Sequence, residues 1–160
     1  MKLIKLTAFT AFSFLSVLLL GSCEKSEEAK KANTYTKTNI TMSGAQVIPL
    51  STSNALGSID VGYIRGTKQL SYKVSWSGLS GNPTGIGLYG PAPIGFGLPP
   101  TPPLQVIPIT GLTTSGSLSG TLLVDEVVVK ENVLLSGMYY IMIRTAAFPA
   151  GEIRGQIVFQ

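Results

Sequence analysis

Apolar and polar residues alternate one by one over several short stretches of this 160-residue chain. The clearest run has its apolar residues at every second position, with serines and a lysine between them: Leu70, Tyr72, Val74 and Trp76. Successive side chains of a β-strand point to opposite faces, so a period of two indicates half-buried antiparallel strands. A second alternating run, at residues 59–63, ends just before a turn that contains Gly66. The two runs therefore predict a β-hairpin.

Six further segments resemble strands and are separated by turn residues: 40–47, 85–89, 104–110, 115–124, 138–145 and 152–159. Eight short strands predict an all-β fold, either an antiparallel β-sandwich or a Greek-key barrel. Residues 125–137 break this pattern. Asp125 could cap a short helix that stops at Gly137, although three consecutive valines favour a strand. We expect a helical turn because Val127, Leu134 and Leu135 could then share one face.

The N-terminus has the layout of a signal peptide, with two lysines followed by an apolar stretch at residues 6–20. This stretch is shorter than the roughly 20 apolar residues that span a bilayer, which favours cleavage over a transmembrane anchor. The sole cysteine of the chain, Cys23, follows directly. Leu20-Gly21-Ser22-Cys23 resembles the bacterial lipobox, in which the cysteine is lipidated and becomes the new N-terminus. We therefore predict a lipoprotein signal peptide over residues 1–22 and a lipid on Cys23.

Residues 24–39 are polar, mixed in charge and almost free of apolar side chains. Together with Cys23 they predict a flexible tether over residues 23–39, which leaves residues 40–160 as one domain. Without a second cysteine the mature chain forms no disulfide, so packing of the core must stabilise the domain. The acidic residues after Cys23 suit a solvated linker, and they also resemble the surface-export signals of some Gram-negative lipoproteins. We expect an exported protein anchored in the cell envelope, in the outer membrane, facing the periplasm or the surface.

The charge of the chain is modest once the signal peptide is set aside. Twelve basic and eight acidic residues become ten and eight when Lys2 and Lys5 are removed, a net charge of +2. From residue 40 onward the charges are scattered, without a basic cluster. A nucleic-acid interface needs a basic patch or stripe. We predict no nucleic-acid partner.

Four segments occur in an order that resembles the CHRD domain, which is named after chordin. They are MSGAQVIP at 42–49, LSYKV leading into SGLSG at 70–81, GPA at 90–92 and TAAFPAGEIRGQ at 145–156. The resemblance covers about residues 40–160, and its closing GEIRGQ is the most specific part. It implies an immunoglobulin-like or superoxide-dismutase-like sandwich, as found in extracellular and exported proteins, without a general enzymatic activity.

The chain departs from this family at three positions. Bacterial relatives usually carry a His-x-His-Gly-Pro-Ala motif and a further histidine, where this chain has Gly87, Tyr89 and Arg144, and it contains no histidine at all. Imidazole and thiolate are the usual protein ligands of zinc and copper. We therefore predict no transition-metal site and no cofactor.

Catalytic groupings are also hard to find. A Ser-His-Asp triad is excluded without histidine, and acid–base catalysis needs groups within hydrogen-bond reach of one another. Glu152 and Arg154 are two apart on a predicted strand and so share a face. We interpret them as a structural ion pair that pins the last strand, and we predict that the protein is not an enzyme.

Residues 90–103 form a Gly- and Pro-rich segment that is the best candidate for a recognition surface. Prolines restrict the chain and so reduce the entropy lost on binding, while Ile94, Phe96 and Leu98 offer apolar anchors. Alternatively, the segment folds over the sandwich end with Phe96 buried. Tyr89 and Phe148 lie beside the replaced histidine positions.

These features predict a lipid-anchored, non-enzymatic CHRD-like module that binds an unknown protein or glycan, with Tyr89, Phe96 and Phe148 as candidate contact residues. A surface adhesion or carbohydrate-binding lipoprotein is the alternative, and it would need exposed aromatic rings on one face. An enzyme would require a cleft that joins carboxylates such as Glu152, Asp60 and Glu131.

Overall fold

The computed structural model describes residues 33–97 and 102–160. The predicted signal peptide, Cys23 and most of the predicted tether lie outside the described residues. Eight strands, one 3-10 turn and one short α-helix follow in the order β1 (Thr34–Ser43), η1 (Gly44–Gln46), β2 (Leu56–Ile64), β3 (Gln69–Ser77), β4 (Pro83–Tyr89), β5 (Gln105–Ile107), β6 (Gly116–Leu123), α2 (Glu131–Leu135), β7 (Tyr140–Thr145) and β8 (Ile153–Gln156).

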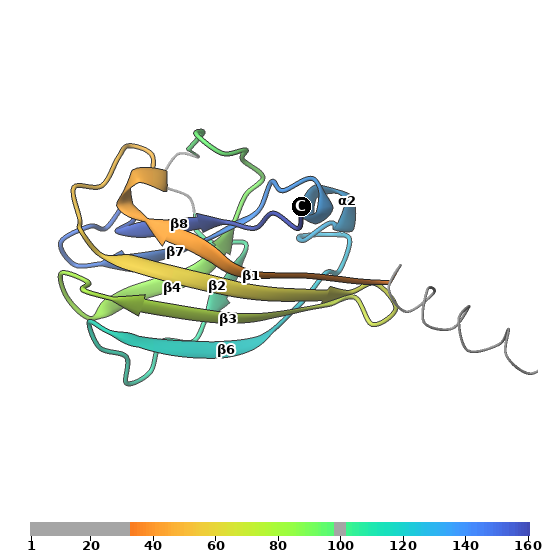
Figure 1. The fold of residues 1–160 in the computed structure, drawn as a ribbon, viewed down its shortest axis with the longest axis horizontal. Helices are drawn as coiled ribbons and strands as arrows, with labels where there is room; N and C mark the ends of the chain where they lie inside the picture. Colours follow the sequence, from red (N-terminus) through yellow and green to blue (C-terminus); the bar gives the residue numbers. More distant parts are fainter. Residues whose placement is uncertain (1–32, 98–101) are drawn as a thin grey trace, which may run out of the picture. The chain divides into compact units, whose positions relative to one another are not determined.

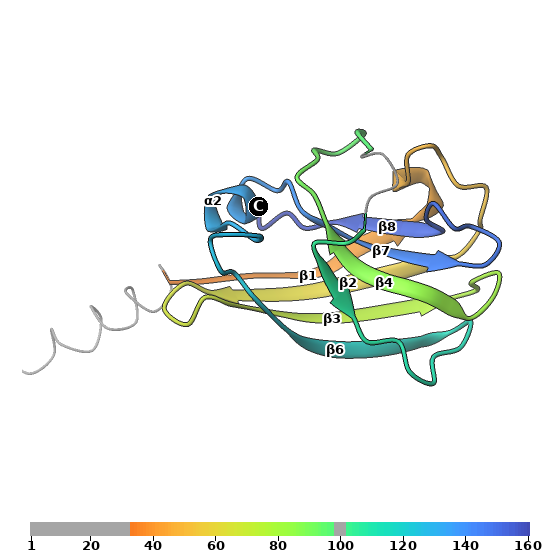
Figure 2. The same ribbon diagram turned by 180° about the vertical axis from the view of Figure 1, so that it is seen from behind.

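The strands form one antiparallel sheet in the order β5-β4-β7-β8-β1-β2-β3-β6, which is rolled into two layers (Figures 1 and 2). Strands β1, β2, β3 and β6 make one layer and the other four make the second. The layers join where Ser43 of β1 pairs with Arg154 of β8. At the opposite edge, Gln105 Nε2 of β5 donates a hydrogen bond to the Leu123 carbonyl oxygen of β6, at a distance of 3.1 Å. The predicted all-β sandwich or barrel is confirmed.

The alternating run at residues 70–76 is a central strand, β3. It pairs with β2 from Leu56↔Ser77 to Ile64↔Gln69 and with β6 along its other edge. Its four apolar side chains are buried in the core, while the serines and Lys73 point outward. The predicted hairpin between residues 59–63 and 70–76 is therefore confirmed, with a turn at residues 65–68.

Gly155 allows β8 to pass closely over the first layer. A Cβ at this position would lie 2.7 Å from Ile59 Cδ1, 2.7 Å from Met42 Cγ and 3.2 Å from the Thr41 carbonyl oxygen. Atoms this close overlap, so a side chain here must push the core apart. This contact explains one of the glycines in the GEIRGQ segment.

The domain begins earlier than the sequence pattern predicts. Strand β1 starts at Thr34, so the predicted tether boundary at residue 39 is wrong for residues 34–39. This threonine-rich stretch pairs with the end of β2, and Tyr35 adds packing, because its ring stacks on Tyr63 at 6.2 Å and meets Phe159 edge-on at 6.0 Å. One aromatic residue among polar neighbours is too weak a periodic signal to be recognised in the sequence.

The segment at residues 125–137 contains the expected short helix, but its start is later than predicted. Helix α2 begins at Glu131, and Asp125 instead accepts hydrogen bonds from the backbone N–H groups of Val127, Val128 and Val129. These bonds lower the pKa of Asp125. Val127 is largely exposed whereas Leu134 is buried, so the predicted shared face is wrong as well.

Helix α2 is held against the end of β2 by a small polar cluster. Glu131 accepts hydrogen bonds from the Tyr63 hydroxyl (2.6 Å) and from Arg65 Nε (2.7 Å). The bond from Tyr63, followed by that from Arg65, outweighs burial and lowers the pKa of Glu131. Over the described residues, no helix combines the length and the apolar character needed to cross a bilayer.

We expect Gly155→Ala to lower the free energy of unfolding by about 1–3 kcal/mol, because the added methyl overlaps two core side chains and a carbonyl. Gly66→Ala is the matched control, since a Cβ there meets nothing within 4 Å. Urea unfolding measures both. Equal stability of the two variants would show that β8 can shift at little cost.

Candidate functional site

The outward face of β4, β7 and β8 carries the residues that the sequence pointed to. Because side chains alternate, Ile141 and Ile143 of β7 enter the main core while Tyr140 and Met142 point to the other side. In register, Tyr140 lies beside Tyr89 of β4 and Gln156 of β8, and Met142 lies beside Arg154. A second small apolar cluster forms on this face, made of Val47, Tyr89, Ala92, Tyr140 and Met142.

The first part of the Gly- and Pro-rich segment covers this face. The Ala92 N–H donates to the Met138 carbonyl (2.8 Å), and the Ala92 carbonyl accepts a bond from Gln156 Nε2 (2.9 Å). Gln156 Nε2 also donates to the Gly137 carbonyl (2.7 Å). The segment is thus packed on the sandwich by its backbone, and it lies on a face rather than over one end (Figure 2).

Arg154 is the centre of this face. The residue as a whole is 2% exposed, and its guanidinium carbon lies 3.6 Å from the centre of the Tyr140 ring. It donates hydrogen bonds to the carbonyls of Phe96 (2.7 Å) and Pro93 (3.3 Å) and to Gln156 Oε1 (2.6 Å). Burial lowers the pKa of Arg154. The side chain therefore binds the covering loop from beneath at two points.

Glu152 makes a separate buried network. Its carboxylate accepts hydrogen bonds from Ser53 Oγ (2.8 Å), from the Ser80 N–H and Oγ (both 2.7 Å) and from the Thr145 hydroxyl. Burial by itself raises the pKa of Glu152, but these bonds outweigh it and leave the pKa below its ordinary value of 4.5. The carboxylate joins three loops and the end of β7 at one end of the sandwich.

The predicted ion pair between Glu152 and Arg154 is therefore wrong. Each side chain has its own partners, and the ion pairs among the described residues are Arg65–Glu131 and Lys68–Glu126. The same-face rule fails because β8 begins only at Ile153. Glu152 precedes the strand and does not follow its alternation.

The three positions at which the resemblance implies histidine do lie together. Gly87 and Tyr89 are on β4, and the Arg144 guanidinium of β7 lies 5.0 Å from the centre of the Tyr89 ring. A Cβ at position 87 would be 2.5 Å from Pro103 Cβ and 2.9 Å from the Gln105 carbonyl oxygen. The returning end of the loop occupies the space that a side chain would need. Within residues 33–97 and 102–160, no group of three or more His, Cys, Asp or Glu residues could hold a metal.

The three candidate contact residues have different environments. Tyr89 is 3% exposed and stacks on Tyr140 at 5.6 Å, so it offers no ring at the surface. Phe148 is half-buried in the turn between β7 and β8. Phe96 is 66% exposed, which makes the expectation of a buried Phe96 wrong. Tyr89 thus belongs to the packing beneath the loop, and Phe96 to its outer surface.

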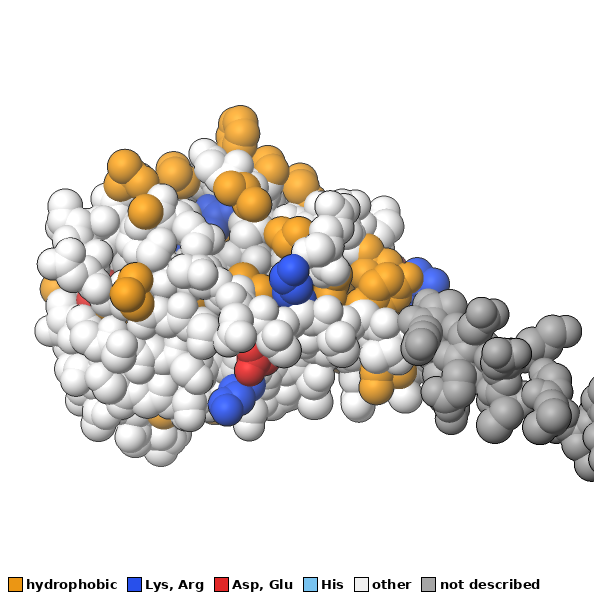
Figure 3. Space-filling model, viewed as in Figure 1, with side chains coloured by type: hydrophobic (Ala, Val, Ile, Leu, Met, Phe, Trp, Pro, Cys, Tyr) orange, Lys and Arg blue, Asp and Glu red, His pale blue; other side chains and the backbone are white. Residues whose placement is uncertain are grey.

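Phe96 belongs to an exposed apolar patch, of which the sequence indicated Ile94 and Phe96 but not the residues from the loop between β1 and β2. Ile94 (67% exposed) precedes it in the same loop, while Ile48 (38%) and Leu50 (68%) come from the loop between β1 and β2. The two loops are adjacent, because a Cβ at Gly97 would lie 2.6 Å from Ile48 Cβ. Apolar side chains accordingly gather over these loops in the upper part of Figure 3. We refer to Ile48, Leu50, Ile94 and Phe96 as the apolar patch.

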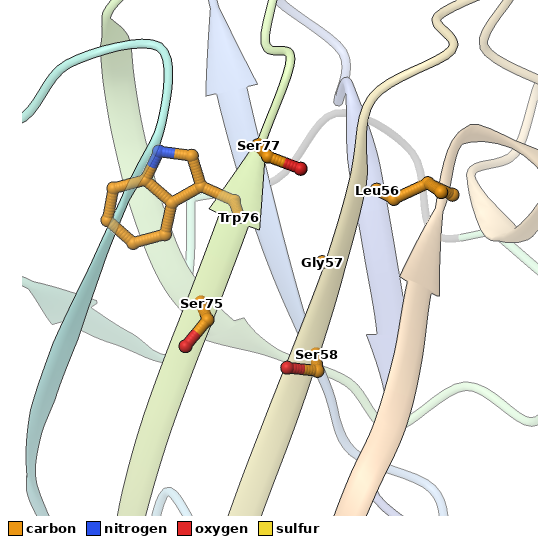
Figure 4. A pocket seen from close by; sticks show the side chains of 6 residues that line it. All are labelled: Leu56, Gly57, Ser58, Ser75, Trp76 and Ser77. Atoms are coloured by element: carbon orange, nitrogen blue, oxygen red, sulfur yellow. The ribbon is translucent and has the colours of Figure 1, made fainter.

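A concavity lies on the outward side of β2 and β3, away from the apolar patch (Figure 4), and has a volume of about 420 Å³. Ser58 and Ser75 are cross-strand partners there, with Ser77 and Leu56 at one end, whereas the Trp76 ring is buried. These residues offer hydroxyl groups but no acid or base. Asp60, Glu131 and Glu152 line neither this concavity nor two others that Ile94 borders.

We expect Glu152→Gln to lower the free energy of unfolding at neutral pH by about 2–4 kcal/mol, because an amide NH₂ then faces donors that the carboxylate accepts. The pKa of Glu152 is depressed in the fold, so its stabilisation is complete above pH 4.5 and is lost as the pH falls through the folded-state pKa.

The difference between wild type and Glu152→Gln should therefore shrink in acid, which urea unfolding between pH 7 and pH 3 measures. Glu126→Gln is the control, since this exposed residue forms a 3.5 Å surface pair with Lys68 and accepts a 3.3 Å bond from the Glu131 N–H, which an amide oxygen can also accept. A difference that stays constant with pH would contradict an ionised, hydrogen-bonded Glu152.

Comparison with known proteins shows the family to which the chain belongs. The family model of the CHRD domain matches residues 38–157, which are 120 of the 160 residues and include the Glu152 and Arg154 networks. Searches of curated proteins and of solved structures found no match. A match over three quarters of the chain shows the family, and the protein is therefore a member of the CHRD domain family.

Proposed function

We propose that this CHRD domain is a non-enzymatic binding module of the cell envelope, tethered by a lipid on Cys23, and that it binds a protein partner through the apolar patch. The patch supports this proposal because Ile94, Leu50 and Phe96 are each about two-thirds exposed on adjoining loops. Grouped apolar side chains that remain in water are typical of protein interaction sites. Scattered single residues would carry no such meaning.

The observation that carries the proposal is the bracing of the patch by Arg154. The carbonyls of Pro93 and Phe96 are both bound by this guanidinium, so the backbone on each side of Ile94 is held down while the side chains of Ile94 and Phe96 remain outside. A loop ordered before binding loses less entropy when a partner docks. The buried charge fixes the backbone of the loop while its apolar side chains stay exposed. Such a loop is better suited to recognition than a turn without internal bonds, which would have to be ordered by the partner.

A protein partner is favoured over a glycan by the distribution of aromatic rings. Sugar-binding surfaces generally use exposed aromatic rings, which combine an apolar face with a polar edge. Among the described residues Phe96 is the one ring that is largely exposed, whereas Trp76, Tyr89 and Tyr140 are buried. The apolar patch is otherwise aliphatic, which suits the side chains of another protein.

The absence of catalysis is part of the proposal and is supported by the surroundings of the acidic groups. Glu152 is enclosed and its oxygens are occupied by hydroxyl and amide donors. Glu131 is bound by Tyr63 and Arg65. An acid–base catalyst needs a titratable group within reach of a bound substrate. Neither carboxylate lines a described concavity.

The proposed anchor would hold the domain close to the bilayer. Strand β1 begins at Thr34, so ten residues, 24–33, separate Cys23 from the first strand. Ten residues span at most about 33–36 Å when fully extended. Two or more acyl chains attach a protein stably to a membrane, whereas one holds only weakly. The partner would thus be a neighbour at the same membrane rather than one across the envelope.

We expect Phe96→Ser to abolish partner crosslinking with little change in stability, because the side chain is exposed and only the backbone of Phe96 is bound by Arg154. A photoreactive amino acid placed at Leu50 in the native envelope reports the contact. Val127→Ser is the matched control, an equally exposed apolar residue outside the patch. A protein adduct at Leu50 that survives Phe96→Ser undiminished would show that Phe96 does not contribute to binding, and failure to form any protein adduct at Leu50 would rule out the patch as the binding surface.

For Cys23→Ser we expect loss of acyl labelling and accumulation of an unprocessed or soluble form, because no other thiol can take the lipid. Metabolic labelling with a fatty acid and fractionation of the cells measure both effects. Ser22→Ala keeps a small residue before the cysteine and should be processed normally. Unchanged membrane retention and processing of Cys23→Ser would refute the lipid anchor.

A further inference from the structure

A small pocket beside the apolar patch opens onto Arg154. It has a volume of about 100 Å³ and is lined by Ala45, Gln46, Ile94, Gly95, Arg154 and Gln156. Arg154 and Gln156 are 2% and 4% exposed, so their polar groups are held in place by the fold. Ile94 belongs both to the pocket and to the apolar patch. A ligand on the patch would therefore have this pocket within its reach.

The positive charge of Arg154 has no negative partner among the described residues. Its three hydrogen bonds go to two carbonyls and one amide oxygen, all of them neutral. A guanidinium has five N–H groups, so these bonds leave part of its donor capacity unused. The face of the Tyr140 ring supplies only a weak attraction. A buried cation is costly unless an anion compensates it.

We propose that this pocket binds a carboxylate, and that the protein partner supplies it next to the apolar residues that cover the patch. The inference rests on the proposed function for its partner, but the pocket itself belongs to this chain. A carboxylate suits the site in charge, since guanidinium–carboxylate hydrogen bonds are among the strongest in proteins. It also suits the site in size, because one water molecule needs roughly 10–15 Å³ of such a cavity and the pocket offers about 100 Å³, which is room for the few atoms of a carboxylate group.

The surroundings of the pocket narrow the chemistry of the ligand. Gln156 Nε2 donates to two carbonyls and so has no N–H left, whereas Gln46 uses one of its two amide N–H groups on the Thr41 carbonyl at 2.7 Å. Arg154 is therefore the charged donor for an incoming acid, and the second amide N–H of Gln46 is the neutral one. The exposed Ile94 side chain borders the opening. An aspartate or glutamate followed by an apolar residue would place its carboxylate at Arg154 and the apolar side chain at Ile94. A C-terminal apolar residue of the partner would do the same with its terminal carboxylate.

The test uses the full-length protein in detergent micelles and sodium acetate as the probe, with sodium chloride at equal ionic strength as the reference. We expect the Nε–H resonance of Arg154 to shift saturably with acetate and not with chloride, and the unfolding midpoint to rise with acetate. A shift that is linear in salt and equal for both anions would overturn the proposal.

Arg154→Met is the direct variant, but it also removes the bonds to Pro93 and Phe96 and could disorder the loop. Ala45→Phe avoids this problem, because Ala45 is exposed, lines the pocket and contributes no side-chain bond to Arg154. We expect Ala45→Phe to lose at least tenfold in acetate affinity while it unfolds normally in chloride, and Ala45→Ser to behave like wild type. Undiminished acetate binding by Ala45→Phe would place the anion elsewhere and refute the pocket.

Two peptides distinguish the source of the carboxylate. Acetyl-Ala-Asp-Phe-amide carries its acid on a side chain, and acetyl-Ala-Ala-Phe carries it at the C-terminus. Competition by one of them with acetate at the Arg154 resonance identifies the source, and failure of both would overturn the link to a protein partner. These measurements need no partner, so the pocket and the proposed function can fail separately. If Phe96→Ser loses crosslinking but no carboxylate binds at Arg154, the pocket is rejected and the proposed function is kept.

Discussion

The contact of Arg154 with the loop above it organises the candidate site. One buried guanidinium lies on the Tyr140 ring, binds the carbonyls of Pro93 and Phe96 and touches Gln156, which in turn holds Ala92 and Gly137. Burying this charge costs free energy, and neutral acceptors offset only part of it. The result is a loop that is fixed at its backbone and exposed at its side chains. Both the apolar patch and the proposed carboxylate pocket depend on that arrangement.

Glu152 fixes loops at one end of the sandwich in a comparable way. Its carboxylate gathers donors from Ser53, Ser80 and Thr145, which belong to three separate parts of the chain. Two opposite charges only two residues apart are thus each buried with different partners instead of with each other. Separate networks let each charge fix a different loop, and a salt bridge between them would have left both loops without a polar anchor.

The three positions at which the family resemblance implies histidine are closely packed in this chain. Gly87 has no room for a side chain because Pro103 and Gln105 lie against it, and the ring at position 89 stacks on Tyr140 beneath Arg144. Aromatic, aliphatic and guanidinium groups fill the face where the family resemblance implies imidazoles. Such a face can bind a partner through its shape and its positive charge, which are the properties that the apolar patch and the proposed carboxylate pocket use.

The alternation of Leu70, Tyr72, Val74 and Trp76 by itself determined that the chain forms antiparallel strands, because a period of two leaves one face of each strand to be buried. The ordered motifs around Met42, Gly90 and Gly155 likewise determined the family. Tertiary structure alone decided the rest, because the partners are distant in the chain. Tyr35 lies in a strand because its backbone pairs with β2 and its ring packs on Tyr63 and Phe159, which are far away in the sequence. Glu152 and Arg154 turn to separate partners because the strand begins between them. Phe96 stays outside and Tyr89 inside because Arg154 holds the loop backbone between them, a contact across 58 residues that no local pattern records.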